Sequence, residues 1–281
     1  MSFTSDAYVA EPESEVEQST AAWLEEQAAM PFIREVAQRS FELMDLRPGD
    51  AVVDVGCGTG VMLPALANAV GPDGSVTGFD HSAAFLARAQ RRITEAGLEH
   101  GVTLVQGDAQ ALPFEDATFD VAHVERLLMH LPEPDAAIRE LVRVTRPGGR
   151  VACAEVYANG ADIENPDRHA MDLINSAAIA QIRNPAMGIE LRRRLVDAGL
   201  ESVRVVAVAL AETFIDPDEI DELRRQGIKL AERGELELAR AQSAIDYVVE
   251  ANEAGRYMGL ALIFIAAGVV PEAMPGAEAT S

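Results

Sequence analysis

Short apolar runs alternate with segments of helical periodicity across the first half of the chain. The apolar runs predict strands at 51–55, 75–79, 102–106, 119–124 and 150–156. Between them, apolar residues recur at helical spacing, which predicts helices at 61–70, 82–96 and 135–144. Strands joined by helices of about 10–15 residues are typical of βαβ crossovers. The pattern therefore predicts an α/β fold built around a parallel sheet.

Glycine, proline and capping residues mark the ends of several of these elements. Ser82 is a suitable N-cap for the helix at 82–96. Residues 20–46 predict two helices separated at Met30-Pro31, because a residue before proline disfavours the helical conformation. The strand at 150–156 is predicted to begin after a break at Pro147-Gly148-Gly149. Residues 1–19 are acidic and have few large apolar groups, which predicts a mobile arm.

Beyond Tyr157 the chain becomes mainly helical, with two further strands. The helical segments are 159–187, 188–198 and a long insertion at 217–253 that is predicted to break at Gly227 and Gly234. The strands are 202–210 and the final apolar run at 257–267. Residues 257–270 resemble a membrane span, but they are too few to cross a bilayer comfortably, which favours a buried strand.

Charge and cysteine content narrow the classes of function. The 281 residues carry a formal net charge of −23, which disfavours nucleic acid and anionic membranes as partners. The basic cluster at 192–194 is interpreted as a solvated helix face. Cys57 and Cys153 lie where a disulfide framework has no reason to form, and no secretory signal is visible, so a cytoplasmic location is expected. No metal site is expected.

The most informative chemical pattern is the turn after the first strand, in the segment AVVDVGCGTG at 51–60. Gly56, Gly58 and Gly60 have G-x-G-x-G spacing, which differs from the G-x-G-x-x-G of dinucleotide-binding folds. Such a turn should face the carboxyl edge of the sheet, where open α/β folds bind ligands. Asp54 would repel a pyrophosphate but attract an ammonium or sulfonium, and the following helix could accept a carboxylate. A purely structural turn is the alternative.

Two further acids follow the next two strands. Asp80 could accept hydrogen bonds from both hydroxyls of a ribose, or it could only cap the helix that begins beyond it. Asp108 could accept from the exocyclic amine of adenine, while the amide of Ala109 donates to a ring nitrogen. Asp54, Asp80 and Asp108 should meet in one crevice, which indicates a site for an adenosine that carries a positive charge and no phosphates.

Four motifs follow one another between about Leu46 and Val156: DVGCGTG, GPDGSVTGFDHS, GDAQALPFEDATFD and HLPEPDAAIRELVRVTRPGGR. In this order they resemble the motifs of class I S-adenosylmethionine-dependent methyltransferases, in the branch of ubiquinone, menaquinone and other small-molecule methyltransferases. The resemblance implies a Rossmann-like α/β fold with a seven-stranded, mostly parallel sheet whose last strand inserts antiparallel between its neighbours. It also implies S-adenosylmethionine as cofactor and S-adenosylhomocysteine as its product.

The same resemblance assigns residues to parts of the cofactor. Asp54 and the glycine turn would hold the methionine part, and the turn residues are Gly56, Cys57, Gly58, Thr59 and Gly60. Asp80 would hold the ribose with His81 beside it, and Asp108 with Ala109 would hold the adenine. Glu125, at the end of the fourth strand, would touch the cofactor.

By this resemblance the chain is expected to form a single methyltransferase domain, 1–281, with a helical cap over the carboxyl edge of the sheet. Its expected parts are an arm and cap helices at 1–46, the cofactor-binding core at 47–160, cap insertions at 161–187 and 216–254, and remaining core elements and tail at 188–215 and 255–281. Apolar residues of the cap either indicate an apolar or aromatic acceptor or merely pack the cap on the core. They include Met171, Leu173, Ile174, Ile179 and Ile182.

Methyl transfer from a sulfonium needs no acid for its leaving group, so alignment and exclusion of water can supply much of the rate. A general base is needed only if the nucleophile arrives protonated, as a hydroxyl does. In sugar hydroxyl methyltransferases that this chain resembles, a histidine stands at the place of His130, which makes His130 the candidate catalytic base. A structural histidine is the alternative. Glu155 or Asp162 could orient it, and His123 is expected to be a core residue.

These observations predict an enzyme that moves a methyl group to oxygen, nitrogen or carbon of a small, apolar or aromatic metabolite, with oxygen favoured by His130. The alternative is a cyclase or another non-methylating protein that retains S-adenosylmethionine as a structural or electrostatic element. A nicotinamide dehydrogenase is opposed by the glycine spacing and by Asp54. The expected partner is a small-molecule acceptor, with no nucleic acid and no membrane insertion, and the arm and cap could mediate a homodimer.

Overall fold

The computed structural model describes residues 20, 21, 25, 26, 28 and 30–272. The arm predicted at 1–19, Trp23 and Leu24 of the first predicted helix, and the tail at 273–281 lie outside these residues. The elements up to the end of β5 are α2 Pro31–Met44, β1 Ala51–Val55, α3 Leu63–Val70, β2 Ser75–Asp80, α4 Ala83–Glu95, β3 Val102–Gln106, β4 Phe119–Glu125, η2 Leu128–His130, α5 Pro134–Val144 and β5 Thr145–Val156. The later elements are η3 Ala158–Gly160, β6 Asp162–Ile163, α6 Arg168–Ile179, α7 Met187–Asp197, β7 Glu201–Glu212, α8 Pro217–Glu232, α9 Leu238–Glu253 and β8 Gly259–Val269.

One mixed sheet runs through the molecule, with the strand order β3-β2-β1-β4-β5-β8. The first five strands of this order run parallel to one another. β8 runs antiparallel to β5 on one side and to β7 on the other. The predicted antiparallel insertion of the last strand between its neighbours is therefore confirmed. The two-residue β6, which also pairs with β8, makes the sheet of the described residues eight-stranded rather than seven-stranded.

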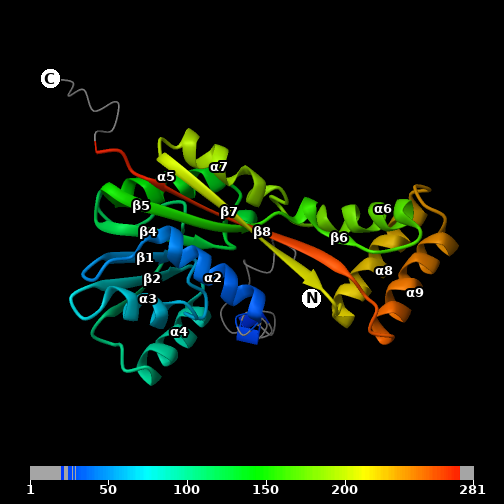
Figure 1. Cartoon of the computed structure of the whole chain (residues 1–281), viewed down its shortest axis with the longest axis horizontal. Helices are drawn as coiled ribbons and strands as arrows, with labels where there is room; N and C mark the ends of the chain where they lie inside the picture. Colours follow the sequence, from blue (N-terminus) through cyan, green and yellow to red (C-terminus); the bar gives the residue numbers. More distant parts are fainter. Residues whose placement is uncertain (1–19, 22–24, 27, 29, 273–281) are drawn as a thin grey trace.

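Helices cover both faces of the sheet (Figure 1). α2, α3 and α4 pack on one face, where Val36, Leu63 and Ile93 are buried, whereas α5 and α7 pack on the other face. α2, which was predicted to belong to the cap, packs on the sheet. Its buried residues Val36 and Met44 lie against the sheet, where β5 presents the small side chains of Ala152 and Ala154. The apolar stripe of α2 thus packs on the core, and its residues Ile33, Ala37 and Phe41 also line a cavity.

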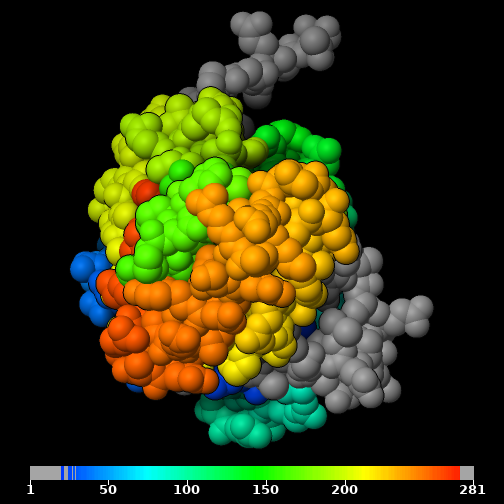
Figure 2. Space-filling model, turned by 90° about the vertical axis from the view of Figure 1, so that its right-hand side faces the viewer, coloured from blue at the N-terminus to red at the C-terminus, as the bar shows by residue number. Residues whose placement is uncertain are grey.

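A lobe of three helices, α6, α8 and α9, extends beyond the ends of β7 and β8 (Figure 1). Figure 2 shows α6, α8 and α9 gathered over that end of the molecule. Gly234 ends α8 with a φ of +72°, as predicted, but the break predicted at Gly227 is wrong. α8 continues through Gly227 because α9 packs closely there, and a Cβ would lie 3.2 Å from Ile245 and 3.3 Å from Ala241.

Two further predictions concern strands of the sheet, β8 and β5. The run at 257–270 is largely the strand β8, as predicted, and no helix within the described residues is both long and apolar enough to span a membrane. β5 begins at Thr145, earlier than predicted, but its pairing with β4 shifts register between Thr145 and Arg150, so an irregularity lies at the predicted Pro147-Gly148-Gly149 break. The backbone amide of Gly148 donates to the carbonyl of Val270 at 2.9 Å, so the end of β8 holds this segment in the sheet.

Candidate cofactor and active site

The glycine turn is fastened to the end of β2 and packed against two other elements. The amides of Gly56 and Cys57 both donate to the carbonyl of Phe79, at 2.7 and 3.0 Å. Gly56 has a φ of +75°, and a Cβ there would lie 2.9 Å from Cδ2 of Leu127. A Cβ on Gly60 would lie 2.8 Å from Cβ of Ala89 on α4. These positions therefore require glycine for both the turn and the close approach of its neighbours.

Two cavities meet at this turn. Gly56, Asp80 and Leu127 line both of them. The larger cavity, of about 680 Å³, extends from Phe79 and Asp80 towards His130. The smaller cavity, of about 240 Å³, lies between the turn, the end of β4 and residues of α2. Gly60 lines neither cavity.

Asp80 stands at the junction of the two cavities and is 5% exposed. One carboxylate oxygen accepts from the amide of Gly58 at 2.9 Å, and the other accepts from the amide of Ser82 at 2.9 Å. Ser82 is the N-cap of α4, as predicted, because its hydroxyl accepts from the amide of Phe85. His81 lies beside it, with Nδ1 3.4 Å from the Asp80 carboxylate. Asp80 thus connects the glycine turn to the start of α4 at the wall of the site.

The far wall of the larger cavity carries the residues predicted for adenine. Asp108 is exposed and accepts from the amide of Gln110 at 2.9 Å, while Ala109 is buried. Both line the larger cavity together with Phe79. The structure therefore brings Asp108 and Asp80 to one cavity, and Asp80 and Asp54 to the adjoining one, as expected from the ends of three neighbouring strands.

The smaller cavity combines carboxylates with polar atoms that lack partners. Asp54 and Glu125 line it, with Cys57 and Thr59 of the turn. The hydroxyl of Thr59 and Oε2 of Glu125 are buried and have no hydrogen-bond partner among the described residues. Buried polar groups are normally paired, so these atoms indicate a missing polar ligand. Two carboxylates suit an ammonium group and a hydroxyl suits a carboxylate, which fits the methionine end of S-adenosylmethionine.

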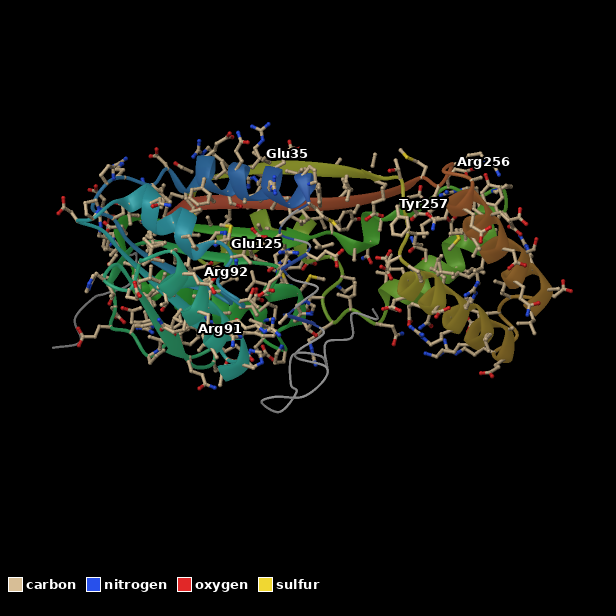
Figure 3. The ribbon with its side chains drawn as sticks, turned by 90° about the horizontal axis from the view of Figure 1, so that it is seen from below. Glu35, Arg91, Arg92, Glu125, Arg256 and Tyr257 are labelled. Atoms are coloured by element: carbon tan, nitrogen blue, oxygen red, sulfur yellow. The ribbon has the colours of Figure 1, made fainter. Side chains whose placement is uncertain are left out.

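Figure 3 shows Glu125 and Glu35 on opposite sides of α2, with Glu125 towards the strands. Arg126, the next residue, has a φ of +52° and its Nε lies 3.2 Å from the Glu125 carboxylate. Cys57 is buried near Asp54 and Asp80, and burial together with these carboxylates raises the pKa of its thiol well above the ordinary value. The Cys57 thiol therefore stays protonated and contributes shape rather than nucleophilic reactivity.

His130 ends the short helix η2 and faces the larger cavity. Burial and the positive charge of Arg126 lower the pKa of His130 to about 4, so the ring is neutral at pH 7. Leu131 and Pro132 line the cavity next to it. The place of His130 at the cavity is as predicted, and its catalytic role stays a prediction.

Glu155 holds the segment before His130 through the main chain. The carboxylate is fully buried and accepts from the amides of Leu127, Leu128 and Met129, at 3.0, 2.6 and 3.3 Å. Asp162 lies at the start of β6, half exposed and paired with Arg168 at 2.8 Å, and lines neither cavity. The structure thus supports Glu155, and not Asp162, as the acid that orients the segment of His130.

Two residues of the site carry no sequence signal. The side-chain amide of Asn184 donates to the carbonyls of Leu128 and Leu131, at 3.1 and 2.8 Å, and so holds η2 through its carbonyls, as Glu155 does through its amides. Arg183, its neighbour, lines the larger cavity. Both follow α6 in an irregular segment without a motif, so only the fold reveals their position.

The apolar cap residues do not form an acceptor pocket at this site. Met171 and Ile174 are buried within the lobe, where they pack against α8 and α9, and Leu173 packs on the same cluster. None of Met171, Leu173, Ile174, Ile179 and Ile182 lines either cavity. The alternative that these residues serve packing is therefore the one that the structure supports.

Comparison with known proteins identifies the family. A methyltransferase domain model matches residues 52–149. A 37.1 kDa protein of transposon TN4556 from Streptomyces fradiae is 31% identical over 265 residues, which are 90% of this chain and 71% of that protein. The demethylmenaquinone methyltransferase of Bacillus cytotoxicus is 42% identical over 130 residues, or 46% of this chain and 54% of that enzyme. The chain belongs to the class I S-adenosylmethionine-dependent methyltransferases.

Solved structures agree with the fold of this methyltransferase. The YcgJ protein of Bacillus subtilis has a TM-score of 0.58 at 20% identity, covering 85% of this chain and all of that one (100%). The [4+2]-cyclase SpnF has a TM-score of 0.50 at 25% identity, covering 85% of this chain and 82% of that one. The match spans about half the length of the demethylmenaquinone methyltransferases. The cofactor of the family is S-adenosylmethionine, as predicted.

Proposed function

We propose that this methyltransferase moves the methyl group of S-adenosylmethionine to a small, largely apolar acceptor, and that the acceptor atom is an oxygen. The observation that carries the proposal is the larger cavity, where neutral His130 stands among Leu127, Leu131 and Pro132. The apolar neighbours favour an apolar acceptor, and one polar ring among them can fix a hydroxyl.

Each part of the cofactor has residues that fit it. Asp54 and Glu125 would face the ammonium group, with the Thr59 hydroxyl available to the carboxylate. Asp80 would hold the ribose, and Asp108 with Ala109 the adenine. When bound, the cofactor supplies a methyl group that is already activated by its sulfonium. The protein then needs to align the acceptor, exclude water and place the acceptor proton near His130.

His130 acts mainly by position in this proposal. A base with a pKa of about 4 is a weak proton acceptor at pH 7, since general bases work best when their pKa lies near the operating pH. A neutral ring can nevertheless accept a hydrogen bond from a hydroxyl and so orient the lone pair of the hydroxyl oxygen. Alignment of this kind can supply a large part of the rate of an in-line displacement.

The proposed function is tested by product stoichiometry. Purified protein is incubated with S-adenosylmethionine and a panel of hydroxylated aromatic compounds, with demethylmenaquinone as a comparison because the relatives are named for it. We expect one S-adenosylhomocysteine for each methylated product, with the methyl group on oxygen. Methylation only at carbon or nitrogen would contradict the choice of oxygen, and failure to bind S-adenosylhomocysteine would contradict the function itself.

A cyclase is the second candidate, because SpnF is similar along 85% of this chain. The cofactor residues would serve both reactions equally well, so their presence does not separate them. The same assay does, since a cyclase converts its substrate without forming S-adenosylhomocysteine. Product that accumulates while S-adenosylhomocysteine stays absent would favour the cyclase.

The pH dependence of the reaction tests the role of His130. Because a base must be neutral, and the pKa of His130 is lowered to about 4, kcat at saturating cofactor and acceptor should not fall between about pH 8 and pH 5.5. His130→Gln, which keeps a hydrogen-bonding group, should lower kcat by about 10²-fold or less and leave the profile flat. An acid limb near the ordinary histidine pKa of about 6.5 that His130→Gln removes would contradict this assignment.

A further inference from the structure

A buried histidine lies directly behind the smaller cavity. His123 of β4 and Asp54 of β1 are register partners on adjacent parallel strands, so their side chains emerge on the same face of the sheet. Nδ1 of His123 lies 2.8 Å from Oδ1 of Asp54, and His123 is 0% exposed. Its other nitrogen, Nε2, is buried and has no hydrogen-bond partner among the described residues. His123, which was expected to be a core residue, therefore has a hydrogen-bond partner among the described residues at only one of its two nitrogens.

The charges around His123 come from few residues. Asp54 and Glu125 are the acids that act on the ring, and Arg126 beyond Glu125 is paired with the Glu125 carboxylate. The neighbouring positions on β5 are Ala152 and Ala154, and α3 carries no charged side chain. From α2 the charged residue at the cavity is Arg34.

These surroundings set the proton affinity of the ring. Burial disfavours the charged form, but the hydrogen bond and charge of Asp54, with the charge of Glu125, outweigh it and raise the pKa of His123. The ring and an ammonium group in the smaller cavity would therefore share one carboxylate.

We propose that His123 is a positioning residue for the cofactor: it fixes the Asp54 carboxylate through Oδ1, presents that carboxylate to the ammonium group, and carries a proton that the ammonium group displaces. The inference rests on the proposed placement of the methionine end in the smaller cavity. Because Asp54 cannot neutralise both cations fully, binding lowers the proton affinity of His123. By linkage, a protonated ring weakens binding by the same factor.

The test compares two ligands that differ in the methionine part. S-adenosylhomocysteine carries the ammonium group, whereas 5′-methylthioadenosine has the same adenosine without it. By calorimetry, the affinity for S-adenosylhomocysteine should fall as the pH is lowered through the raised pKa of His123, at most tenfold for each unit by which binding lowers that pKa. The affinity for 5′-methylthioadenosine should change less than about twofold. A pH effect that arises at the ribose site around Asp80 would change both affinities and is thereby separated.

Two variants test whether the pH dependence of S-adenosylhomocysteine binding comes from His123 and Asp54. His123→Asn keeps a side-chain N–H near Nδ1 but cannot become charged, so the affinity for S-adenosylhomocysteine should become independent of pH. Should that variant fail to fold, Asp54→Asn removes the other partner, and it should weaken S-adenosylhomocysteine binding and abolish the pH dependence. Calorimetry in buffers of different ionisation enthalpy should show proton release on binding to the wild type and none with His123→Asn.

Two results would overturn the inference. One is S-adenosylhomocysteine affinity that is equal at pH 6 and pH 8 in the wild type. The other is an unchanged pH dependence in folded His123→Asn and Asp54→Asn. Either outcome would leave the proposed function intact, because it requires only that S-adenosylhomocysteine binds, whereas absence of binding at every pH would remove the function and not only the role of His123.

Discussion

Replacement of Glu155 by alanine is expected to lower the free energy of unfolding by about 3–5 kcal/mol. The carboxyl group is fully buried and accepts hydrogen bonds from three consecutive backbone amides, those of residues 127–129. Alanine would leave these amides without an acceptor in the interior, and each unsatisfied buried group costs about 1–3 kcal/mol. Denaturant unfolding at pH 7 measures the loss.

The same variant should disturb the site as well as the fold. Leu127 lines both cavities and His130 lines the larger one, so a shift of this segment moves the walls of both. S-adenosylhomocysteine should bind more weakly to folded Glu155→Ala. The matched control is Glu232→Ala, at the exposed end of α8, which should change stability by no more than about 0.5 kcal/mol. A loss below about 1 kcal/mol for Glu155→Ala would show that the three hydrogen bonds contribute little.

The effect of Glu155 should depend on pH in a defined direction. Burial raises the pKa of Glu155 from 4.5 to about 8, although the three amides oppose the change. Between about pH 4.5 and pH 8, the folded state therefore keeps a proton on this carboxyl group that the unfolded state has released. Stability from this group is full below about pH 4.5 and is lost as the pH rises through about 8. The difference between wild type and Glu155→Ala should accordingly be larger at pH 5 than at pH 8.5.

The elements with local signals were predicted closely from the sequence. β1, at Ala51–Val55, begins and ends as predicted, and β3 does too. The N-cap at Ser82 and the extended conformation of Met30 before proline also follow from residues that act on their immediate neighbours. Where one residue determines a turn or a cap, the surrounding fold changes the outcome little.

The errors have a common physical cause, which is contact between distant parts of the chain. Gly227 is a helix breaker by propensity, yet close packing of α9 against it makes glycine the residue that fits. The packing of α2 on the sheet was not predicted, because helical periodicity shows that a helix has an apolar face and not which surface covers it. The irregularity at Pro147-Gly148-Gly149 lies inside β5, because backbone hydrogen bonds with Val270, just beyond β8, hold this segment in the sheet.

The candidate site shows the same division. The sequence predicts that Asp54, Asp80 and Asp108 lie close together, because parallel strands end at one edge of the sheet. The pairing of Asp54 with His123 could not be predicted, because it depends on the register of β1 against β4. Asn184 was missed for a similar reason, because its hydrogen bonds to η2 join segments more than fifty residues apart.

Replacement of Asp80 by alanine is expected to weaken S-adenosylhomocysteine binding by about 10²- to 10⁴-fold. A carboxylate that accepts from two ribose hydroxyls makes two hydrogen bonds to a charged group, worth about 1.5–3 kcal/mol each. Asp80 also accepts from the amides of Gly58 and Ser82, so its loss loosens the turn where the methionine part would lie. Calorimetric titration of the variant at pH 7.5 gives the change.

The choice of ligand separates the ribose contact from a general loss of structure. 5′-Methylthioadenosine carries the same ribose and should lose affinity to a similar extent, unlike its response to changes at His123. A 2′-deoxy analogue of S-adenosylhomocysteine lacks one hydroxyl, so Asp80→Ala should weaken its binding by a clearly smaller factor. The control is Asp73→Ala, an exposed aspartate in the turn before β2, which should bind normally. If folded Asp80→Ala bound all these ligands as the wild type does, the ribose would have to lie elsewhere in the larger cavity.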